Sequence, residues 1–276
     1  MGATEFTSEP QPSFAIAAEC DLAEIMQVVL RVGVLMLQAG TVSFRVEQAM
    51  QRIAVGLGAD RLDAYVTLTG ITASVHRSRQ HYTQIVRVVG LGVDMNRLAA
   101  VEFLSMHLPE NSTPHQVMVL LDKIEKIPPV YPLHLVLVAV AISCGAFALL
   151  QGGGWIEFAA AAVGAGGGQA TRIYLRSLKL NPIPTTVVCS AIAILICFSL
   201  VQTFDRFGYD TLNAQYGYLS SVLFLVPGAP LITAALDLIR FDLVSGLSRI
   251  AYVLILIFSL AAGILTAGVF VNFSIL

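Results

Sequence analysis

Residues 218–236 read YLSSVLFLVPGAPLITAAL, an apolar stretch of membrane-spanning length that two prolines and a glycine interrupt. A proline inside a helix removes a backbone hydrogen bond and clashes with the preceding turn. Pro227 is therefore expected to free the carbonyl of Leu223, and Pro230 to free that of Val226. The first nine residues would form about 13 Å of helix, which places the break near the middle of a bilayer.

The break at Pro227 and Gly228 has a functional interpretation. Irregular backbone at membrane depth is tolerated only where protein or a water-filled cavity covers it. Transporters bind substrates at such breaks, because freed amides meet anions and freed carbonyls meet cations. We therefore expect Pro227, Gly228 and Pro230 to shape a substrate site. An ordinary proline kink that binds no ligand is the alternative.

The composition is that of a membrane protein. The chain has 276 residues, of which 56% are hydrophobic and 12% charged, and its mean hydropathy is +0.77. Soluble domains carry about 25% charged residues, so much of this chain is expected to face lipid. The formal net charge of -2 gives no indication of nucleic-acid binding.

The charges divide the chain into two parts. Ten of the 16 basic residues and 13 of the 18 acidic residues precede residue 130, where a group of prolines marks the boundary. We expect a polytopic α-helical membrane protein with a small N-terminal α+β cytoplasmic domain. The predicted divisions are a disordered lead-in over 1–19, the cytoplasmic domain over 20–130 and the transmembrane domain over 131–276.

Five stretches of the second half are long and apolar enough to predict transmembrane helices, the fourth broken at Pro227-Gly228. Basic residues in the short connections favour a bacterial inner-membrane protein with its N-terminal domain inside and its C-terminus outside. Small residues recur at four-residue steps in the second stretch, which favours close helix packing. The predicted spans are 133–150, 155–174, 185–201, 218–236 and 250–271.

The first half shows helical and strand patterns. Two helices are predicted between residues 20 and 57, separated by Gly40, with Thr41 or Ser43 capping the second. Alternating, β-branched stretches over 65–75 and 82–89 predict two or three strands around turns. Two further helices are expected to open at Asp94 and at Thr113-Pro114, and the last to run into the membrane domain.

No catalytic motif is present in the sequence. The chain lacks the H-E-x-x-H, G-x-S-x-G and P-loop patterns, and its four cysteines show no metal-ligand spacing, so no catalytic residue, metal or cofactor is predicted. Asp237 and Arg240 lie three residues apart on one helix face and could pair as an inner gate or coupling group. Gln169 and Arg172 could line a pathway.

These motifs together resemble the threonine/serine exporter family, and within it the larger, YjjP-type subunit of the split members. The resemblance covers nearly the whole chain from about residue 28. The residues that carry it are Leu225-Val-Pro-Gly-x-Pro-Leu-Ile232, Ala235, Asp237, Gly246-Leu-x-Arg249, Leu37-Gln-x-Gly40, Ser43, Val46-Glu47, Arg52, Gly153-Gly-Trp155 and the spacing from Arg172 to Pro182.

The resemblance implies a secondary transporter that moves small polar amino acids, threonine or serine, or small dicarboxylates such as succinate outward, driven by the proton gradient. It also implies a second small membrane subunit or a homo-oligomer. Thr233, near the expected site, and Phe241 depart from the family pattern, which leaves the substrate open. As vestibule or assembly residues we expect Gln38, Gly40, Ser43, Arg45 and Glu47.

Three other functions remain to be weighed. A membrane-embedded enzyme would need a nucleophile and a base at matching depth, which the apolar spans do not offer, and we expect no enzyme. A membrane-anchored sensor or scaffold would need only one or two spans and no break. A passive channel would differ from a transporter because dissipation of the proton gradient would not affect it.

Overall fold

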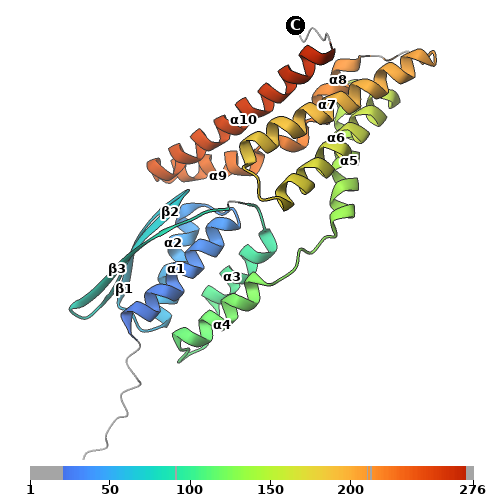
Figure 1. The fold of residues 1–276 in the computed structure, drawn as a ribbon. Coiled ribbons are helices and arrows are strands. Elements are labelled where there is room, and N and C mark those ends of the chain that lie inside the picture. Colours follow the sequence, from blue (N-terminus) through green and yellow to red (C-terminus); the bar gives the residue numbers. More distant parts are fainter. Residues whose placement is uncertain (1–20, 91, 210, 212, 272–276) are drawn as a thin grey trace, which may run out of the picture.

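The computed structural model describes residues 21–90, 92–209, 211 and 213–271. It contains a small helix-and-sheet domain and a helical bundle, which meet where α9 and the start of α10 lie beside the domain (Figure 1). The predicted disordered lead-in lies outside the described residues. The part from residue 21 to Glu125 has the predicted α+β character.

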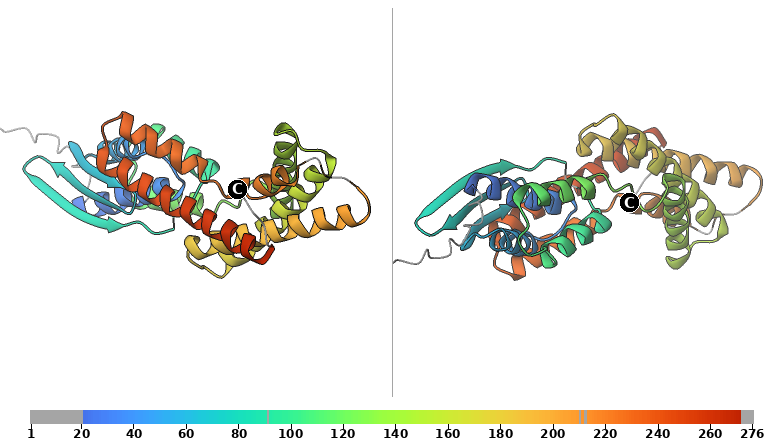
Figure 2. Two further views of the ribbon diagram at one scale, coloured as in Figure 1. Left: turned by 90° about the horizontal axis from the view of Figure 1, so that it is seen from above. Right: turned by 90° about the horizontal axis from the view of Figure 1, so that it is seen from below.

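A three-stranded antiparallel sheet and two helices that cover one of its faces form the centre of the small domain (Figure 2). The strands follow one another in the order β1-β2-β3, so of the two or three strands that the sequence predicted, three are present. The first turn falls inside the predicted stretch 65–75 and divides it between β1 and β2. The elements are α1 (Leu22–Gln38), α2 (Ser43–Gly56), β1 (Arg61–Thr67), β2 (Gly70–Arg77), β3 (Gln80–Arg87), α3 (Met95–Met106) and α4 (Pro114–Glu125).

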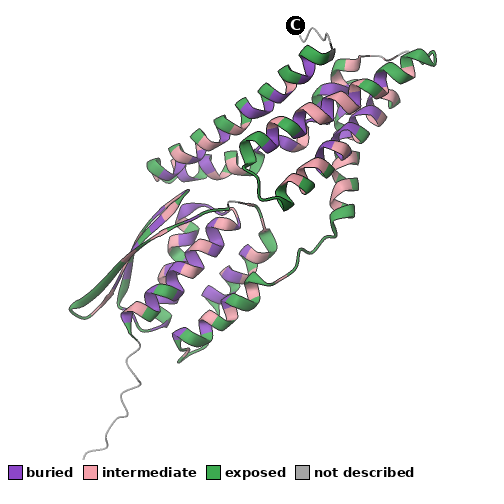
Figure 3. Cartoon of the chain, viewed as in Figure 1, coloured by how far each residue is buried: buried purple, intermediate pink, exposed green. Residues whose placement is uncertain are grey.

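Helix α1 supplies the largest share of the core of this domain. Its apolar residues recur at helical spacing, so one broad face is buried against α2, the sheet and the last two helices (Figure 3). Ile25, Met26 and Val29 are fully buried, and Ile71 and Val75 meet them from the inner face of β2. No helix of the described part of the chain covers the opposite face of the sheet, which leaves Tyr65 and Ile85 exposed.

The caps at the starts of α3 and α4 are those that the sequence predicted, whereas the cap predicted for α2 is absent. The side chain of Asp94 caps α3, and Thr113 caps α4 in a capping box followed by Pro114, as predicted. The prediction that Thr41 or Ser43 caps α2 is wrong. The residue before the helix is Val42, whose side chain has no acceptor, so α2 begins without a cap of its own. Helix α4 also ends at Glu125 instead of continuing into the bundle.

The bundle is built from long helices and one broken segment. Helix α6 packs along both α5 and α7, and α10 packs along α7 and α9. The elements are α5 (Leu133–Leu150), α6 (Trp155–Ser177), α7 (Pro182–Arg206), α8 (Ala214–Ser221), the short 3₁₀ helix η1 (Leu223–Leu225), α9 (Gly228–Ile239) and α10 (Leu243–Val271).

Length and composition support fewer spans than the five predicted. Within the described residues, three helices, α5, α7 and α10, are long and apolar enough to cross a membrane, and the bent pair α8–η1 with α9 raises the number to four. Helix α6 is long enough, but glycines and the polar residues Gln169, Arg172 and Arg176 lower its hydropathy. Its crossing of the membrane therefore remains a prediction.

Small residues of α6 bring it close to α7, as the sequence pattern predicted. A side chain at Gly164 would place its Cβ 2.7 Å from the carbonyl oxygen of Ala193, and one at Gly168 would come within 2.9 Å of the Ala193 Cβ. Both distances are shorter than van der Waals contact. The glycines are therefore required for the approach of the two helices.

We expect Gly164→Ala to destabilise the bundle by about 1–3 kcal/mol, because the added methyl group collides with backbone of α7 that cannot move aside. The measurement is the thermal unfolding midpoint of the purified chain in detergent. Gly166→Ala is the matched control, since its Cβ would meet the nearest atom at an ordinary 3.6 Å. Equal midpoints for the two variants would contradict this account of the packing.

Candidate functional site

The break in the fourth predicted span is a sharp turn centred on Pro227. The segment Ala214–Leu225 and helix α9 are bent by 60° relative to each other. Pro227 has φ -80° and ψ 61°, and the amide of Gly228 donates to the carbonyl of Val226 at 2.9 Å. These angles and this bond define an inverse γ-turn. Helix α9 starts directly after it.

The turn uses the carbonyls that were expected to be free. The Leu223 carbonyl accepts from the amide of Val226 at 3.1 Å, and the Val226 carbonyl accepts from Gly228. The prediction that the prolines free these two carbonyls for a ligand is therefore wrong. What the break offers is the start of α9. There the amide of Gly228 is used in the turn, the amide of Leu231 donates to the carbonyl of Pro227, and Pro230 has no amide hydrogen, so the amide of Ala229 is the donor left without a partner among the described residues.

A cavity of about 300 Å³ lies beside this turn. It brings together five residues that the sequence nominated, Arg172, Val226, Pro227, Gly228 and Pro230, and it leaves out the other five of the substrate set. A Cβ at Gly228 would meet no atom within 4 Å, so this position opens into free space. The rest of the lining is Gly92, Val93, Arg176, Leu180, Pro182, Thr185, Thr186, Phe224, Leu225, Ala229, Tyr252 and Leu256.

Two arginines of α6 give the cavity its charge. Arg172 and Arg176 lie four residues apart and therefore on one helix face, and Arg172 also donates to the carbonyl of Phe224 at 3.4 Å. The described residues of the lining include no aspartate or glutamate. Sequence reasoning missed Arg176, although its spacing from Arg172 could have indicated it. It also missed Gly92 and Val93, which reach the cavity from the small domain.

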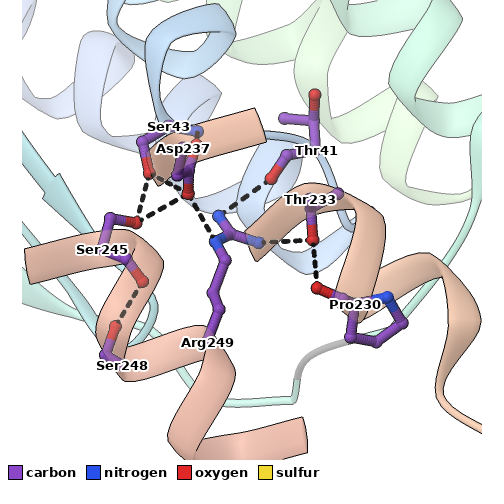
Figure 4. Close-up of polar contacts among 8 residues, drawn as sticks. All are labelled: Thr41, Ser43, Pro230, Thr233, Asp237, Ser245, Ser248 and Arg249. Atoms are coloured by element: carbon purple, nitrogen blue, oxygen red, sulfur yellow. Dashed lines mark hydrogen bonds and ion pairs between the residues drawn. The ribbon is translucent and has the colours of Figure 1, made fainter. Parts of the chain in front are cut away.

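A second polar centre lies where the small domain meets the bundle (Figure 4). Asp237 of α9 is fully buried, and its Oδ2 lies 2.8 Å from Nε of Arg249 of α10. The amide and the hydroxyl of Ser43 donate to the two oxygens of this carboxylate at 3.0 and 3.1 Å, and the Ser245 hydroxyl donates to it at 3.0 Å. Arg249 in turn donates to the carbonyl of Thr41 at 2.9 Å.

The predicted pairing of Asp237 with Arg240 is therefore wrong. Helix α9 ends at Ile239, and the guanidinium of Arg240 lies 4.3 Å from the ring centroid of Phe44 in α2. Asp237 instead pairs across the tight turn with Arg249. Helical spacing alone could not find this partner, because the two residues belong to different helices.

The other nominated residues have separate positions. The Thr233 hydroxyl donates to the carbonyl of Pro230 at 3.0 Å and accepts from Arg249 at 3.4 Å, so it lies between the cavity and the junction. Gln169 is buried in α6, and its Oε1 has no hydrogen-bond partner among the described residues. Leu223 lines an apolar cavity between η1 and α5.

The residues nominated for a vestibule or for assembly hold the small domain together or face the junction. Gln38 donates to the carbonyl of Val89 at 2.8 Å, and Arg45 pairs with Glu102 at 3.5 Å. Gly40 has φ +88°, and a Cβ there would lie 2.5 Å from the carbonyl oxygen of Gly92, so only glycine fits. Their roles in export or assembly remain predictions.

Glu47, one turn after Ser43 on α2, is electrostatically coupled to this junction. Burial, followed by the negative charges of Asp242 and Asp237, raises the pKa of Glu47 to about 7, although a hydrogen bond from the backbone of Val66 opposes the shift. Burial and the charge of Asp237 also raise the pKa of Asp242 above its ordinary value. Among the described residues, no group of three or more His, Cys, Asp or Glu could hold a metal ion.

Comparison with known proteins identifies the family. The family model of threonine/serine exporters, ThrE, matches residues 27–271. The chain belongs to the threonine/serine exporter family. A "Probable succinate transporter subunit YjjP" of Escherichia coli K12 is 25% identical over 254 residues, which cover 88% of this chain and 93% of that protein. No solved structure matches the chain.

A longer relative in this family shows how much larger a member can be. The "Threonine/serine exporter" of Corynebacterium glutamicum is 26% identical over 250 residues, which are 88% of this chain and only 50% of that protein. A second "Probable succinate transporter subunit YjjP", from Klebsiella aerogenes, is 23% identical over 88% of this chain and 92% of its own length. The matches include both the small domain and the bundle, so the two parts occur together in exporter family members.

We expect Arg249→Met to destabilise the protein by about 3–5 kcal/mol, because it leaves the carboxylate of Asp237 buried without a cation. Arg240→Met is the control and should cost less than about 1 kcal/mol, since it removes only an exposed contact with an aromatic ring. Unfolding of the full chain in detergent measures both. The double variant Asp237→Asn/Arg249→Met should recover most of the loss; no recovery would refute the charge argument.

Proposed function

We propose that this chain is a subunit of a secondary exporter that moves a small carboxylate-bearing metabolite out of the cytoplasm, through the cavity beside Pro227. The candidate substrates are serine, threonine and small dicarboxylates such as succinate. Family membership and the relatives named above support transport. The substrate and the driving force are our proposals.

The cavity at the start of α9 is the observation that carries this proposal. Helix starts carry a partial positive charge, and transporters direct the starts of broken helices at anionic groups. Arg172 and Arg176 add two guanidinium groups, which form charge-assisted hydrogen bonds with carboxylates. With no acidic residue in its lining, the cavity favours an anion over a cation.

The proposal also includes the orientation of the chain in the membrane, the energy source of export and a second subunit. The basic residues between the predicted spans support an inner-membrane protein with a cytoplasmic small domain and an external C-terminus. The proton gradient would drive export. A second small membrane subunit would supply the rest of the pathway, because the corynebacterial exporter is about twice as long and the Escherichia coli relative carries the word subunit in its name.

Two other functions are alternatives: a sensor or scaffold that does not use the cavity, and a passive channel whose transport is not coupled to the proton gradient. A sensor or scaffold needs neither a break in a span nor a cavity with two arginines. A passive channel could use both, but its transport would not depend on the proton gradient. The measurements below separate these possibilities.

The first test is efflux of labelled serine, threonine and succinate from preloaded cells that lack their own exporters. The chain is expressed with and without a small membrane partner, and with and without an uncoupler. Uncoupler-sensitive efflux of one solute is expected. Efflux that ignores the uncoupler would favour the channel, and no efflux of any of the three with both subunits in the membrane would favour the scaffold.

We expect Arg172→Gln and Arg176→Gln each to raise the KM for the exported carboxylate by about tenfold to a hundredfold, the effect of losing one charge-assisted hydrogen bond. Arg206→Gln is the matched control, because Arg206 ends α7 away from the cavity. Efflux kinetics measure the change, and unchanged KM values in both cavity variants would exclude this binding site.

We expect Gly228→Leu to abolish export while the protein still reaches the membrane, because the side chain would enter the free space beside the turn. Gly228→Ala fits without collision and should retain measurable export. The control is membrane abundance of both variants by quantitative blotting. Full export by Gly228→Leu would contradict the placement of the pathway.

A further inference from the structure

Helix α2 receives its missing cap from the membrane bundle. Val42 cannot accept a hydrogen bond through its side chain, but the carboxylate of Asp237 accepts both the amide and the hydroxyl of Ser43. A carboxylate at a helix start satisfies a free amide and is favoured by the helix dipole. Asp237 therefore binds the start of α2, a helix of the small domain, to α9.

Helix α9 extends from the contact between Asp237 and Ser43 to the cavity. Asp237 lies near its end, whereas Gly228 and Pro230 at its start line the cavity. The helix has 12 residues and is about 18 Å long, short enough to move as one body. Gly92 and Val93 of the small domain also line the cavity, so a displacement of the small domain relative to α9 would change the wall of the cavity.

Negative charge exceeds positive charge inside this junction. Asp237, Asp242 and Glu47 contribute three carboxylates, and Arg249 is the one buried cation among the described residues that face them. Arg249 pairs with Asp237, and its charge, together with hydrogen bonds from Ser43 and from the backbone of Ser245, also lowers the pKa of Asp242 in part. The charges that act on Glu47 are the negative ones of Asp242 and Asp237. Arg240 is exposed and lies over Phe44. Repulsion between the carboxylates therefore opposes the contact of α2 with the bundle.

No cation on the other side of Glu47 removes this repulsion. That side faces a polar cleft between α2 and β1, where Arg52 and Asp63 are the other charged residues. Arg52 donates to the hydroxyl of Ser105 at 3.3 Å, and Asp63 pairs with Arg61 at 3.0 Å and lies 3.0 Å from His76. Within the described part of the chain, Glu47 has no ion-pair partner.

We propose that Glu47 is the proton-binding residue of a latch between the small domain and α9, and that its charge state sets how tightly α2 is held against Asp237 and Asp242. With a neutral Glu47, the caps and the ion pair hold the junction closed. Ionisation adds a third negative charge and loosens α2. The pKa of about 7 places this change near neutral pH. Its link to transport, but not the latch itself, rests on the proposed function.

A fluorescence titration tests the latch without measuring transport. Phe44→Trp in a Trp155→Phe background places the sole tryptophan at the junction, against the guanidinium of Arg240. The full chain is reconstituted in liposomes and titrated between about pH 5.5 and 8.5, around the value where Glu47 changes charge. We expect a single fluorescence step with its midpoint near the pKa of Glu47, about 7.

Two substitutions of Glu47 and one control variant test whether Glu47 causes the fluorescence step. Glu47→Gln mimics the neutral acid and should remove the step and keep the acid-form fluorescence at all pH values, whereas Glu47→Asp should keep a step. Glu24→Gln, on the exposed side of α1, should leave the titration unchanged. An unchanged step in Glu47→Gln, or no step in the parent, would overturn the proposal. Lost efflux with an intact step would count against the proposed transport function alone.

A stability measurement provides a second readout. Because the pKa of Glu47 in the folded state lies above the ordinary value of 4.5, the folded chain loses stability as pH rises from about 4.5 to about 7, where this carboxyl group becomes charged in the folded state. Glu47→Gln should therefore raise the unfolding midpoint at pH 8 by about 3 °C and leave it nearly unchanged at pH 5. An equal change at both pH values would indicate a packing effect and refute the titration.

Discussion

The buried carboxylate of Asp237 is the contact that fixes the two parts of this protein relative to each other. It is fully buried, and it joins α9, α10 and the start of α2 through Arg249, Ser245 and Ser43. A buried charge is costly unless it is paired and hydrogen-bonded, so all partners must be in place together. Helix α9 also begins at the cavity, so the position of the cavity wall depends on the contacts of Asp237.

The break in the fourth predicted span forms a site of hydrogen-bond donors. The end of the 3₁₀ helix η1 uses the carbonyl of Leu223, and the inverse γ-turn at Pro227 uses that of Val226; both could otherwise have coordinated a cation. The cavity then retains the start of α9 and the guanidinium groups of Arg172 and Arg176. The turn at Pro227 that interrupts the helix therefore adds to the preference for an anion that Arg172 and Arg176 give the cavity.

Features with local causes could be predicted from the sequence, and features that depend on distant contacts could not. Proline and glycine chemistry predicted the break, and capping patterns predicted the starts of α3 and α4 at Asp94 and Thr113. The partner of Asp237 was missed because helical spacing detects only neighbours on one helix. The absent cap of α2 was missed because its acceptor lies 194 residues away. Glycines that allow α6 to pack closely also lower the hydropathy by which spans are recognised.

The distance along the chain between α2 and its cap has a consequence for biosynthesis. Ser43 leaves the ribosome long before Asp237 and Arg249, so the apolar core of the small domain can form while the start of α2 is still incomplete. The missing bonds form only after α9 and α10 have been synthesised and have packed against the start of α2. The small domain therefore gains the last hydrogen bonds of α2 only when α9 and α10 have reached their final positions in the bundle.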